Sequence, residues 1–300
     1  MTVSPPFLKA NSIIKIVAPA RSFAREKVSF LEEEVRNIGF EVQLGSTIGT
    51  CYHQYSSTDR ERFRDLQNAL DNPDIHAIWC ARGGYGTIRI LDQLNFTKFM
   101  EFPKWIIGYS DITILHTKLQ SIGIQSIHGA LVLDYGQGSH QVRQRTLSCL
   151  QGKYPEYTYA SSSYAIVGEA RGTLWGGNLS ILYSLLGTDT LPDLEETIVF
   201  IEDVDEYVYH IDRMMISLKR SGVLSKIKGL IVGAMTNIHD HETPFGMSYQ
   251  ESIIDAVKSY GIPVAFNFPS GHVADNNPLI LGAEVALCVT KKKTTMRYVE

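Results

Sequence analysis

Three residue types that together carry out nucleophilic catalysis occur at the ends of predicted strands, in the chain order serine, acid, histidine. Ser110 follows the apolar run 105–108, Glu202 ends the run 197–201, and His272 follows the run 264–268 on a tight loop that contains proline and glycine. A serine hydroxyl becomes a good nucleophile when a base removes its proton, and a carboxylate fixes the tautomer of that base. The pattern favours a Ser-Glu-His unit, provided that the fold brings the three segments together.

Ser110 stands at a predicted junction of strand, turn and helix, where its hydroxyl would lie above a helix N-terminus. This is the arrangement of a nucleophile elbow, in which neighbouring backbone N–H groups also stabilise an oxyanion. Gly108 provides room for the turn, but Ile112 replaces the second glycine of the usual G-x-S-x-G pattern. Serine is also a preferred N-cap residue, so this segment alone leaves a structural interpretation open.

A glycine-rich segment, Arg82-Gly-Gly-Tyr-Gly86, follows another predicted strand. Glycines let the backbone approach a ligand closely, and the exposed N–H groups suit an anion or an oxyanion. The segment lacks both the Walker lysine and the G-x-G-x-x-G spacing, so it does not match a nucleotide-binding fingerprint. A plain strand-to-helix turn is the alternative interpretation.

The acidic and histidine residues also have alternative interpretations. Asp205 and Glu206, which follow Glu202, are typical of a solvated cluster that stabilises the N-terminus of the next helix. His272 could be a surface or a core histidine, and His128 is a rival because it too ends a predicted strand. A metal site would need clustered histidines or a second carboxylate site elsewhere in the chain, and the sequence shows neither, so we expect no metal. We also expect no cofactor.

Short apolar strands alternate with amphipathic helices in the first half of the chain. Such alternation indicates a parallel sheet covered on both faces. The capping box Thr58-Asp-Arg-Glu61 marks the start of one helix. The strands are predicted over 13–18, 41–44, 76–81, 104–109 and 124–128, and further helices over 24–38, 112–122 and 141–150.

The second half is predicted to form a strand-rich α/β domain. Its helices are expected over 178–186, 208–220 and 248–260, its strands over 198–201, 229–234 and 264–268, and an antiparallel meander over 279–298. A stretch rich in Gly, Gln, Ser and Tyr separates the halves. We therefore expect an N-terminal doubly wound domain over 1–135, a linker over 136–163 and a C-terminal domain over 164–300.

Composition excludes several classes of protein. The chain has 300 residues and a net charge of −4, with no basic patch for nucleic acid or an anionic membrane. Its apolar runs are strand-sized, far below the ~18 residues of a membrane-spanning helix. Four scattered cysteines and an N-terminus interrupted by prolines and lysines predict reduced thiols, no secretory signal and a cytoplasmic protein.

The order and spacing of these motifs resemble the LD-carboxypeptidase family, the murein tetrapeptide carboxypeptidases, which also includes the microcin-C self-immunity peptidases. The resemblance covers nearly the whole chain. It is carried by Ile16-Val-Ala-Pro19, Ala81-Arg-Gly-Gly-Tyr-Gly86, Ile107-Gly-Tyr-Ser-Asp-Ile-Thr113, His128-Gly129, Gly176-Gly-Asn-Leu179, Phe200-Ile-Glu-Asp203, Ile211-Asp-Arg213 and Gly271-His272.

The resemblance implies a role for each residue of the site. Ser110 would be the nucleophile, His272 the general base and Glu202 the carboxylate that orients it, while backbone N–H groups of Gly84 and Asp111 would form the oxyanion hole. It also implies a metal-independent homodimer that removes the terminal D-alanine of muropeptide tetrapeptides during cell-wall recycling.

The sequence leaves the substrate and its contacts open. Residues that could bind the substrate are Arg82, Tyr85, Arg171 and Arg213, and any of the three arginines could hold a terminal carboxylate. Alternative functions are cleavage of a microcin-C-type peptidyl-adenylate, metal-dependent hydrolysis, and non-catalytic binding of a small anion by the glycine-rich segment.

Overall fold

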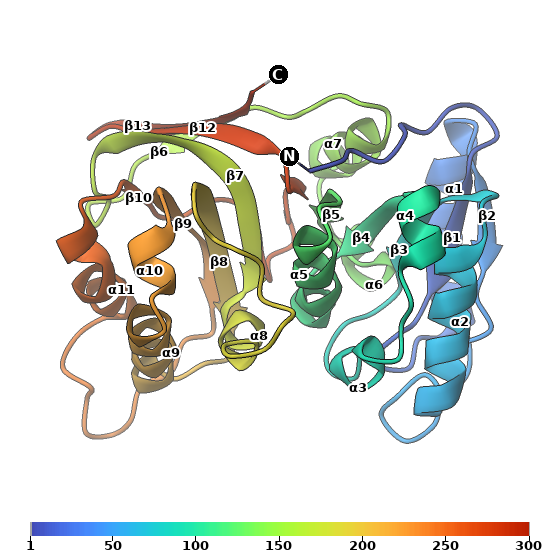
Figure 1. Cartoon of the computed structure of the whole chain (residues 1–300), viewed down its shortest axis with the longest axis horizontal. Helices are drawn as coiled ribbons and strands as arrows, with labels where there is room; N and C mark the ends of the chain where they lie inside the picture. Colours follow the sequence, from blue (N-terminus) through green and yellow to red (C-terminus); the bar gives the residue numbers. More distant parts are fainter. Residues whose placement is uncertain (1, 300) are drawn as a thin grey trace. The chain divides into compact units, whose positions relative to one another are not determined.

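The computed structural model describes residues 2–299 and shows an α/β fold built on two sheets (Figure 1). The chain divides into two compact units, of which the first comprises residues 1–154 and 274–280 and the second residues 155–273 and 281–300. This division differs from the expected linker over 136–163. Residues 136–154 belong to the first unit, and a late segment returns to that unit, which nothing in the sequence indicated.

The first unit is a doubly wound sheet with the order β11-β5-β4-β3-β1-β2. Every recorded pairing among β1 to β5 is parallel, as predicted. Its strands are β1 (Ile13–Val17), β2 (Glu41–Leu44), β3 (Ile75–Cys80), β4 (Trp105–Gly108), β5 (Ser126–His128) and β11 (Leu279–Leu281). Because the strand order reverses between β1 and β3, the crevice beyond their carboxyl ends is where this class of sheet binds ligands.

Helices cover both faces of this first sheet. They are α1 (Ser29–Asn37), α2 (Asp59–Asp71), α3 (Ile88–Leu91), α4 (Thr97–Glu101), α5 (Thr113–Ser121), α6 (Val132–Tyr135) and α7 (His140–Leu150), with 3₁₀ turns η1 (Arg25–Val28) and η2 (Ser110–Ile112). The predicted capping box at the start of α2 is confirmed, since the Thr58 side chain accepts a hydrogen bond from the Glu61 N–H.

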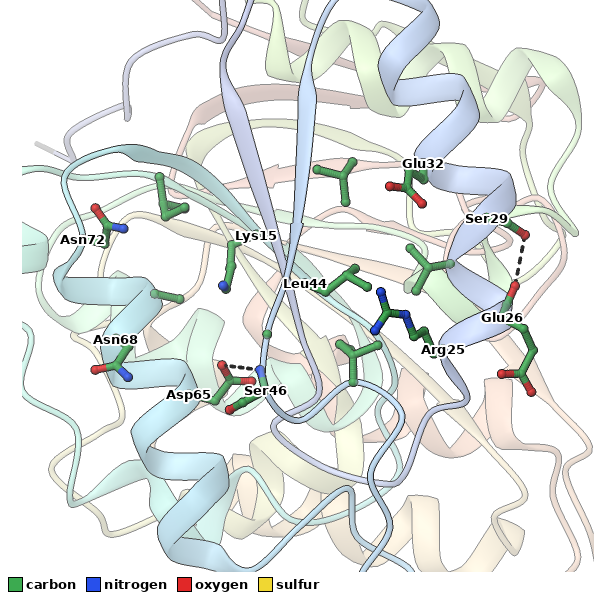
Figure 2. A pocket seen from close by; sticks show the side chains of 16 residues that line it. Lys15, Arg25, Glu26, Ser29, Glu32, Leu44, Ser46, Asp65, Asn68 and Asn72 are labelled. Carbon is green, nitrogen blue, oxygen red and sulfur yellow. Dashed lines mark hydrogen bonds between the residues drawn. The ribbon is translucent and has the colours of Figure 1, made fainter.

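A polar groove runs along the free edge of β2, between α1 and α2 (Figure 2). Lys15 and Arg25 line it, as does Asp65, whose carboxylate accepts a hydrogen bond from the Ser46 N–H at 3.0 Å. None of Ser110, Gly84 and Asp111 lines this groove. It is therefore separate from the residues for which the sequence predicts chemistry.

The second unit contains a seven-stranded mixed sheet with the order β10-β9-β8-β7-β12-β13-β6. The pairings from β10 to β7 are parallel, whereas those from β7 to β6 are antiparallel. The strands are β6 (Tyr157–Ala160), β7 (Gly168–Asn178), β8 (Thr197–Val204), β9 (Gly229–Thr236), β10 (Val264–Ala265), β12 (Glu284–Val289) and β13 (Lys293–Tyr298).

The helices of the second unit pack an apolar core with the parallel half of this sheet. They are α8 (Leu179–Ser184), α9 (Val208–Arg220), α10 (Val223–Lys226) and α11 (Tyr249–Val257), followed by the 3₁₀ turn η3 (Lys258–Tyr260). Core residues include Ile211 and Met215 of α9 and Ile253 of α11. Within residues 2–299, no helix combines the length and the apolar character that crossing a bilayer requires.

The predicted antiparallel meander over 279–298 is only partly correct. Strands β12 and β13 do form an antiparallel hairpin, but β11 joins the first sheet instead. A run of three apolar residues fits either sheet equally well, because the local pattern contains no information about a partner strand that lies far away in the sequence.

Candidate active site

Ser110 adopts a left-handed backbone conformation, with φ of +62°, directly after the buried strand β4. This conformation costs an L-residue ~1–2 kcal/mol, and such strain at a residue other than glycine is concentrated at functional sites. Tyr109 occupies the N-cap position of η2, and no side chain caps that turn. The interpretation of Ser110 as a plain N-cap therefore does not describe this junction, whereas a strained elbow does.

The glycine-rich loop after β3 packs directly against Ser110. A Cβ atom built on Gly83 would lie 3.2 Å from the Ser110 Cβ and 3.4 Å from both the Ser110 Oγ and the Asp111 backbone nitrogen. The next residue, Gly84, has φ of +100°, a region that side chains rarely allow. Glycine at position 83 leaves the space beside the hydroxyl open and lets the loop backbone approach it.

The Asp111 side chain joins this loop to the turn that carries Ser110. Its buried Oδ2 accepts hydrogen bonds from the backbone N–H and the hydroxyl of Thr87, at 2.9 and 2.6 Å. Burial raises the pKa of the Asp111 carboxyl, and the two Thr87 hydrogen bonds oppose that rise. Because both partners are buried, this contact fixes the end of the glycine-rich loop relative to the backbone N–H of Asp111.

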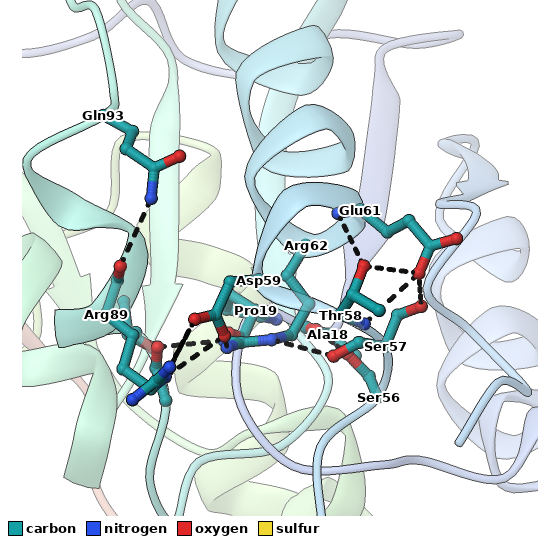
Figure 3. Close-up of polar contacts among 12 residues, drawn as sticks. Ala18, Pro19, Ser56, Ser57, Thr58, Asp59, Glu61, Arg62, Arg89 and Gln93 are labelled. Carbon is teal, nitrogen blue, oxygen red and sulfur yellow. Dashed lines mark hydrogen bonds and ion pairs between the residues drawn. The ribbon is translucent and has the colours of Figure 1, made fainter. Parts of the chain in front are cut away.

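A buried arginine, Arg62, also anchors this loop (Figure 3). The Arg62 guanidinium donates to the carbonyl of Gly86 at 2.9 Å and to the carbonyl of Pro19, and it pairs with Asp59. It therefore ties the segment after β1 to the glycine-rich loop. Sequence analysis missed both Arg62 and Thr87, because each acts through contacts with chain segments that lie far away in the sequence.

His116, also in the first unit, holds the end of the strand that precedes the Ser110 turn. Its Nε2 lies 2.8 Å from the carbonyl oxygen of Gly108 and its Nδ1 lies 2.8 Å from the hydroxyl of Ser126. A carbonyl only accepts, so Nε2 carries the proton and Nδ1 accepts from the serine. Full burial lowers the pKa of His116 to about 4, which keeps the imidazole neutral at pH 7.

This histidine makes folding stability depend on pH. The pKa of His116 in the folded protein lies below its value of ~6.5 in the unfolded chain. The stability that the neutral imidazole contributes is therefore complete above pH ~6.5 and is lost as the pH falls towards 4. We expect the free energy of unfolding to fall by about 2 kcal/mol between pH 7 and pH 5 through this group. Urea denaturation should show a smaller decrease for His116→Gln and an unchanged one for His140→Gln, an exposed control. Equal pH dependence in wild type and His116→Gln would contradict the assignment.

Glu202 and His272 form a hydrogen-bonded pair within the second unit. The His272 Nδ1 lies 2.7 Å from the Glu202 Oε2, and the His272 backbone N–H donates to the same oxygen at 3.2 Å. Glu202 lies in the buried part of β8 and its side chain is 0% exposed, whereas that of His272 is 19% exposed. A buried carboxylate can only accept, so Nδ1 carries the proton and Nε2 is the basic nitrogen of the neutral ring.

The backbone around His272 is built to make this pairing. Gly271 has φ of +120°, and a Cβ atom there would lie 2.8 Å from the Glu202 Oε2 and 2.9 Å from its Cβ. Only glycine lets the chain pass this close to the carboxylate. On the other side, the Thr236 hydroxyl donates to the His272 carbonyl at 3.0 Å, which fixes the loop to the end of β9.

A second buried carboxylate, Asp203, lies next to Glu202 in the chain. Its pKa is raised to about 7, chiefly by burial and then by the charge of Glu202. It accepts hydrogen bonds from the Asn178 side chain at 2.8 Å and from the Ser180 N–H at 2.9 Å. Asp203 thus fixes the start of α8 at the carboxyl end of β7, the strand that pairs with β8.

The residues suggested as substrate contacts lie in different surroundings. Arg82 donates to the Ser22 carbonyl at 2.9 Å, and Tyr85 is 43% exposed in the glycine-rich loop. Arg171 is an exposed residue of β7 paired with Glu284, and Arg213 of α9 lies over the ring of Tyr209. His128, the rival histidine, is buried beside the ring of Tyr109.

The structure therefore contains two preassembled groups of candidate residues, one in each unit. Ser110, the glycine-rich loop and Asp111 come together in the first unit, and Glu202 and His272 come together in the second. The described residues contain no group of three or more His, Cys, Asp or Glu side chains arranged to hold a metal ion. The first group contains a strained serine beside a glycine-lined backbone, and the second contains an oriented imidazole; these are the kinds of group that nucleophilic acyl transfer uses.

Comparison with known proteins identifies the family of the chain. The family model for the LD-carboxypeptidase N-terminal domain matches residues 14–129, and the model for the C-terminal domain matches residues 171–287. The chain belongs to the LD-carboxypeptidase family, and it is thus a member of a family of peptidases.

Individual relatives cover nearly all of the chain. The chain is 32% identical over 303 residues to the probable murein peptide carboxypeptidase of Bacillus subtilis, covering 97% of this chain and 93% of that protein. It is 27% identical to the murein tetrapeptide carboxypeptidase of Pseudomonas aeruginosa, with coverages of 91% and 92%.

Solved structures also align with nearly the whole chain. Muramoyltetrapeptide carboxypeptidase from Oxalobacter formigenes has a TM-score of 0.88 at 27% identity, covering 96% of this chain and 99% of that one. The structure of MccF in complex with glutamyl sulfamoyl guanosine has a TM-score of 0.83 at 22% identity, with both chains 98% covered. At that identity the second likeness concerns the fold alone.

Proposed function

We propose that this chain is a serine carboxypeptidase that removes the terminal D-alanine from muropeptide tetrapeptides. The names of relatives across its whole length support this substrate class. The observation that carries the serine mechanism is the left-handed Ser110 on the turn after β4, with Gly83 packed against its side chain. The proposal requires His272 and Ser110 to come within hydrogen-bonding reach of each other.

In the first step, the Ser110 Oγ attacks the carbonyl carbon before the D-alanine while its proton passes to the His272 Nε2. The Glu202 carboxylate holds the Nδ1–H, so it stabilises the imidazolium that forms. The negative charge on the carbonyl oxygen is held by the backbone N–H groups of Gly84 and Asp111. One such donor typically lowers the barrier by ~3 kcal/mol.

The tetrahedral intermediate then collapses. The carbon–nitrogen bond breaks, the leaving nitrogen takes the proton from His272, and D-alanine departs as a free amino acid. In the second half, His272 removes a proton from water as the water attacks the acyl ester. The proton returns to the Ser110 Oγ when the ester bond breaks, which regenerates the enzyme and releases the tripeptide acid.

The direct test is incubation with a purified muropeptide tetrapeptide that ends in D-alanine. We expect release of one alanine per peptide, identified by mass, with D chirality shown on a chiral column. A matched peptide that ends in L-alanine should be cleaved poorly. Absence of alanine release from the D-peptide would refute the proposal, and faster hydrolysis of a peptidyl-adenylate would favour the other known substrate class. A cytoplasmic location remains a prediction from the cysteines and the N-terminal sequence, and a homodimer remains a prediction from the family resemblance.

A further inference from the structure

Arg21 lies over the glycine-rich loop next to the residue that contacts Ser110. It follows β1 by four residues, at the point where the strand order of the first sheet reverses. A Cβ atom on Gly84 would lie 2.5 Å from the Arg21 Cδ and 2.7 Å from its Nε, so the arginine stem crosses directly over that glycine. The neighbouring Gly83 contacts Ser110. Gly83 therefore contacts the nucleophile and Gly84 contacts this cation, and the Cα atoms of these consecutive residues are about 3.8 Å apart.

The charge of Arg21 has no counter-ion in residues 2–299. No carboxylate forms an ion pair with it there, and its Nε is buried without a hydrogen-bond acceptor. Arg21 as a residue is only partly buried, but a buried Nε–H without an acceptor costs free energy that a ligand acceptor would recover. The neighbouring Arg62 differs, because it pairs with Asp59 and donates to backbone carbonyls.

The segment that carries Arg21 is fixed on both sides. The Ser56 N–H donates to the Ala20 carbonyl and the Ser22 N–H donates to the Gln54 carbonyl, both at 3.1 Å. Arg82 holds the Ser22 carbonyl from the glycine-rich loop, and Arg62 holds the Pro19 carbonyl (Figure 3). Arg21 is thus positioned before any ligand arrives, which reduces the entropic cost of binding.

The chemistry of a carboxypeptidase substrate explains why a cation is needed at this place. Its terminal carboxylate is separated from the scissile carbonyl by one nitrogen and one Cα, which is a span of roughly 3–4 Å from the standard bond lengths. The group that binds the carboxylate must therefore lie about one residue away from the oxyanion hole. A guanidinium suits this task because its planar N–H groups match a carboxylate in a two-pronged hydrogen bond.

We propose that Arg21 binds the terminal carboxylate of the substrate and so restricts the enzyme to the last peptide bond. This inference rests on the proposed function and adds the residue that distinguishes a free C-terminus from an internal bond. Arg82 then acts as a positioning residue, because it holds the backbone of the Arg21 segment rather than the substrate.

The test compares two tetrapeptides that differ only at the terminus, one with a free D-alanine carboxylate and one with D-alaninamide. Wild type should prefer the free acid. In Arg21→Met, kcat/KM for the acid should fall by at least about 30-fold, mainly through KM, while that for the amide stays within about threefold. Arg21→Lys should retain an intermediate preference, and Arg25→Met, in the groove beside β2, should behave as wild type.

Binding measured by calorimetry in a Ser110→Ala background decides the question independently of turnover. The acid should bind more tightly than the amide, and adding Arg21→Met should remove that difference. An Arg21→Met enzyme that keeps the full preference for the acid, or that loses activity equally on both peptides, would overturn the inference. A wild type that cleaves neither peptide would refute the proposed function instead, and the calorimetric comparison would still decide whether Arg21 binds a carboxylate.

Discussion

Ser110→Ala is expected to leave a folded protein whose kcat is lower by roughly 10⁴- to 10⁶-fold, because the variant lacks the atom that attacks the carbonyl. The remaining rate would come from the oxyanion hole and from substrate binding. Release of D-alanine from a muropeptide tetrapeptide measures the effect. Ser121→Ala, at the far end of α5, is a matched control that should keep full activity, since the Ser121 hydroxyl only bonds the Lys118 carbonyl. Near-normal turnover by Ser110→Ala would remove this serine from the mechanism.

The backbone of Ser110 gives the same experiment a readout besides activity. Alanine has the same clash as serine at φ of +62°, whereas glycine does not. Ser110→Gly should therefore be more stable than Ser110→Ala, by up to ~1 kcal/mol in urea denaturation, although both are inactive. Equal stability of the two variants would contradict the idea that the elbow stores strain for function.

The local pattern of the first unit was predictable from sequence. Its five parallel strands stand out as short apolar runs, and the capping box at Thr58 has a direct chemical meaning, so both the strands and the start of α2 were recognised. The same holds for α9, whose apolar residues recur at helical spacing over Val208–Arg220. These features depend only on neighbours in the chain, which is why a sequence reveals them.

Two strands were missed for physical reasons. The eleven-residue strand β7 contains Gly172, Gly176 and Gly177, which have low strand propensity. Gly172 and Gly176 are needed because the backbone at and just before β8 lies very close: a Cβ on Gly172 would be 2.3 Å from the Glu196 carbonyl oxygen, and one on Gly176 would be 1.8 Å from the Phe200 carbonyl oxygen. Strand β6 was hidden within the predicted linker, since it contributes only an edge to a sheet formed by distant segments.

The site was predictable to a similar extent. Ser110, Glu202 and His272 were found because each is a polar residue that ends or closely follows a predicted apolar strand, and the three residue types together fit one catalytic unit. Arg21 was missed because, although it follows its strand as closely as His272 follows its own, an arginine has no place in a pattern of serine, acid and histidine. Its importance arises from contact with Gly84, and only coordinates show that contact.

The pairing of Glu202 with His272 leads to the second large effect. Glu202→Gln keeps the size of the side chain but removes the charge that fixes the Nδ1–H tautomer. An amide can donate to Nδ1, which would place the proton on Nε2 and block its role as base. We therefore expect kcat to fall by roughly 10³- to 10⁴-fold, and His272→Ala to be at least as severe. Activity on the tetrapeptide, followed from pH 6 to 9, measures both.

A second acid–histidine pair in the same unit provides the control. Glu206 contacts His210 one helical turn along the chain, and both are partly exposed. Glu206→Gln should therefore change kcat by less than about threefold, because that histidine lies outside the proposed mechanism. If Glu206→Gln were as damaging as Glu202→Gln, the loss would reflect a general need for negative charge in this part of the unit, and the specific role of Glu202 would be wrong.

Double variants separate one catalytic unit from three independent contributions. If Ser110, His272 and Glu202 act together, removing the serine leaves nothing for the imidazole to deprotonate, so a further His272→Ala change should cost almost nothing. The same reasoning applies to Glu202→Gln in the His272→Ala background. Because the serine and the pair belong to different compact units, this non-additivity is also a solution test that they meet during turnover. Losses that simply multiply would mean that the two halves never form one site.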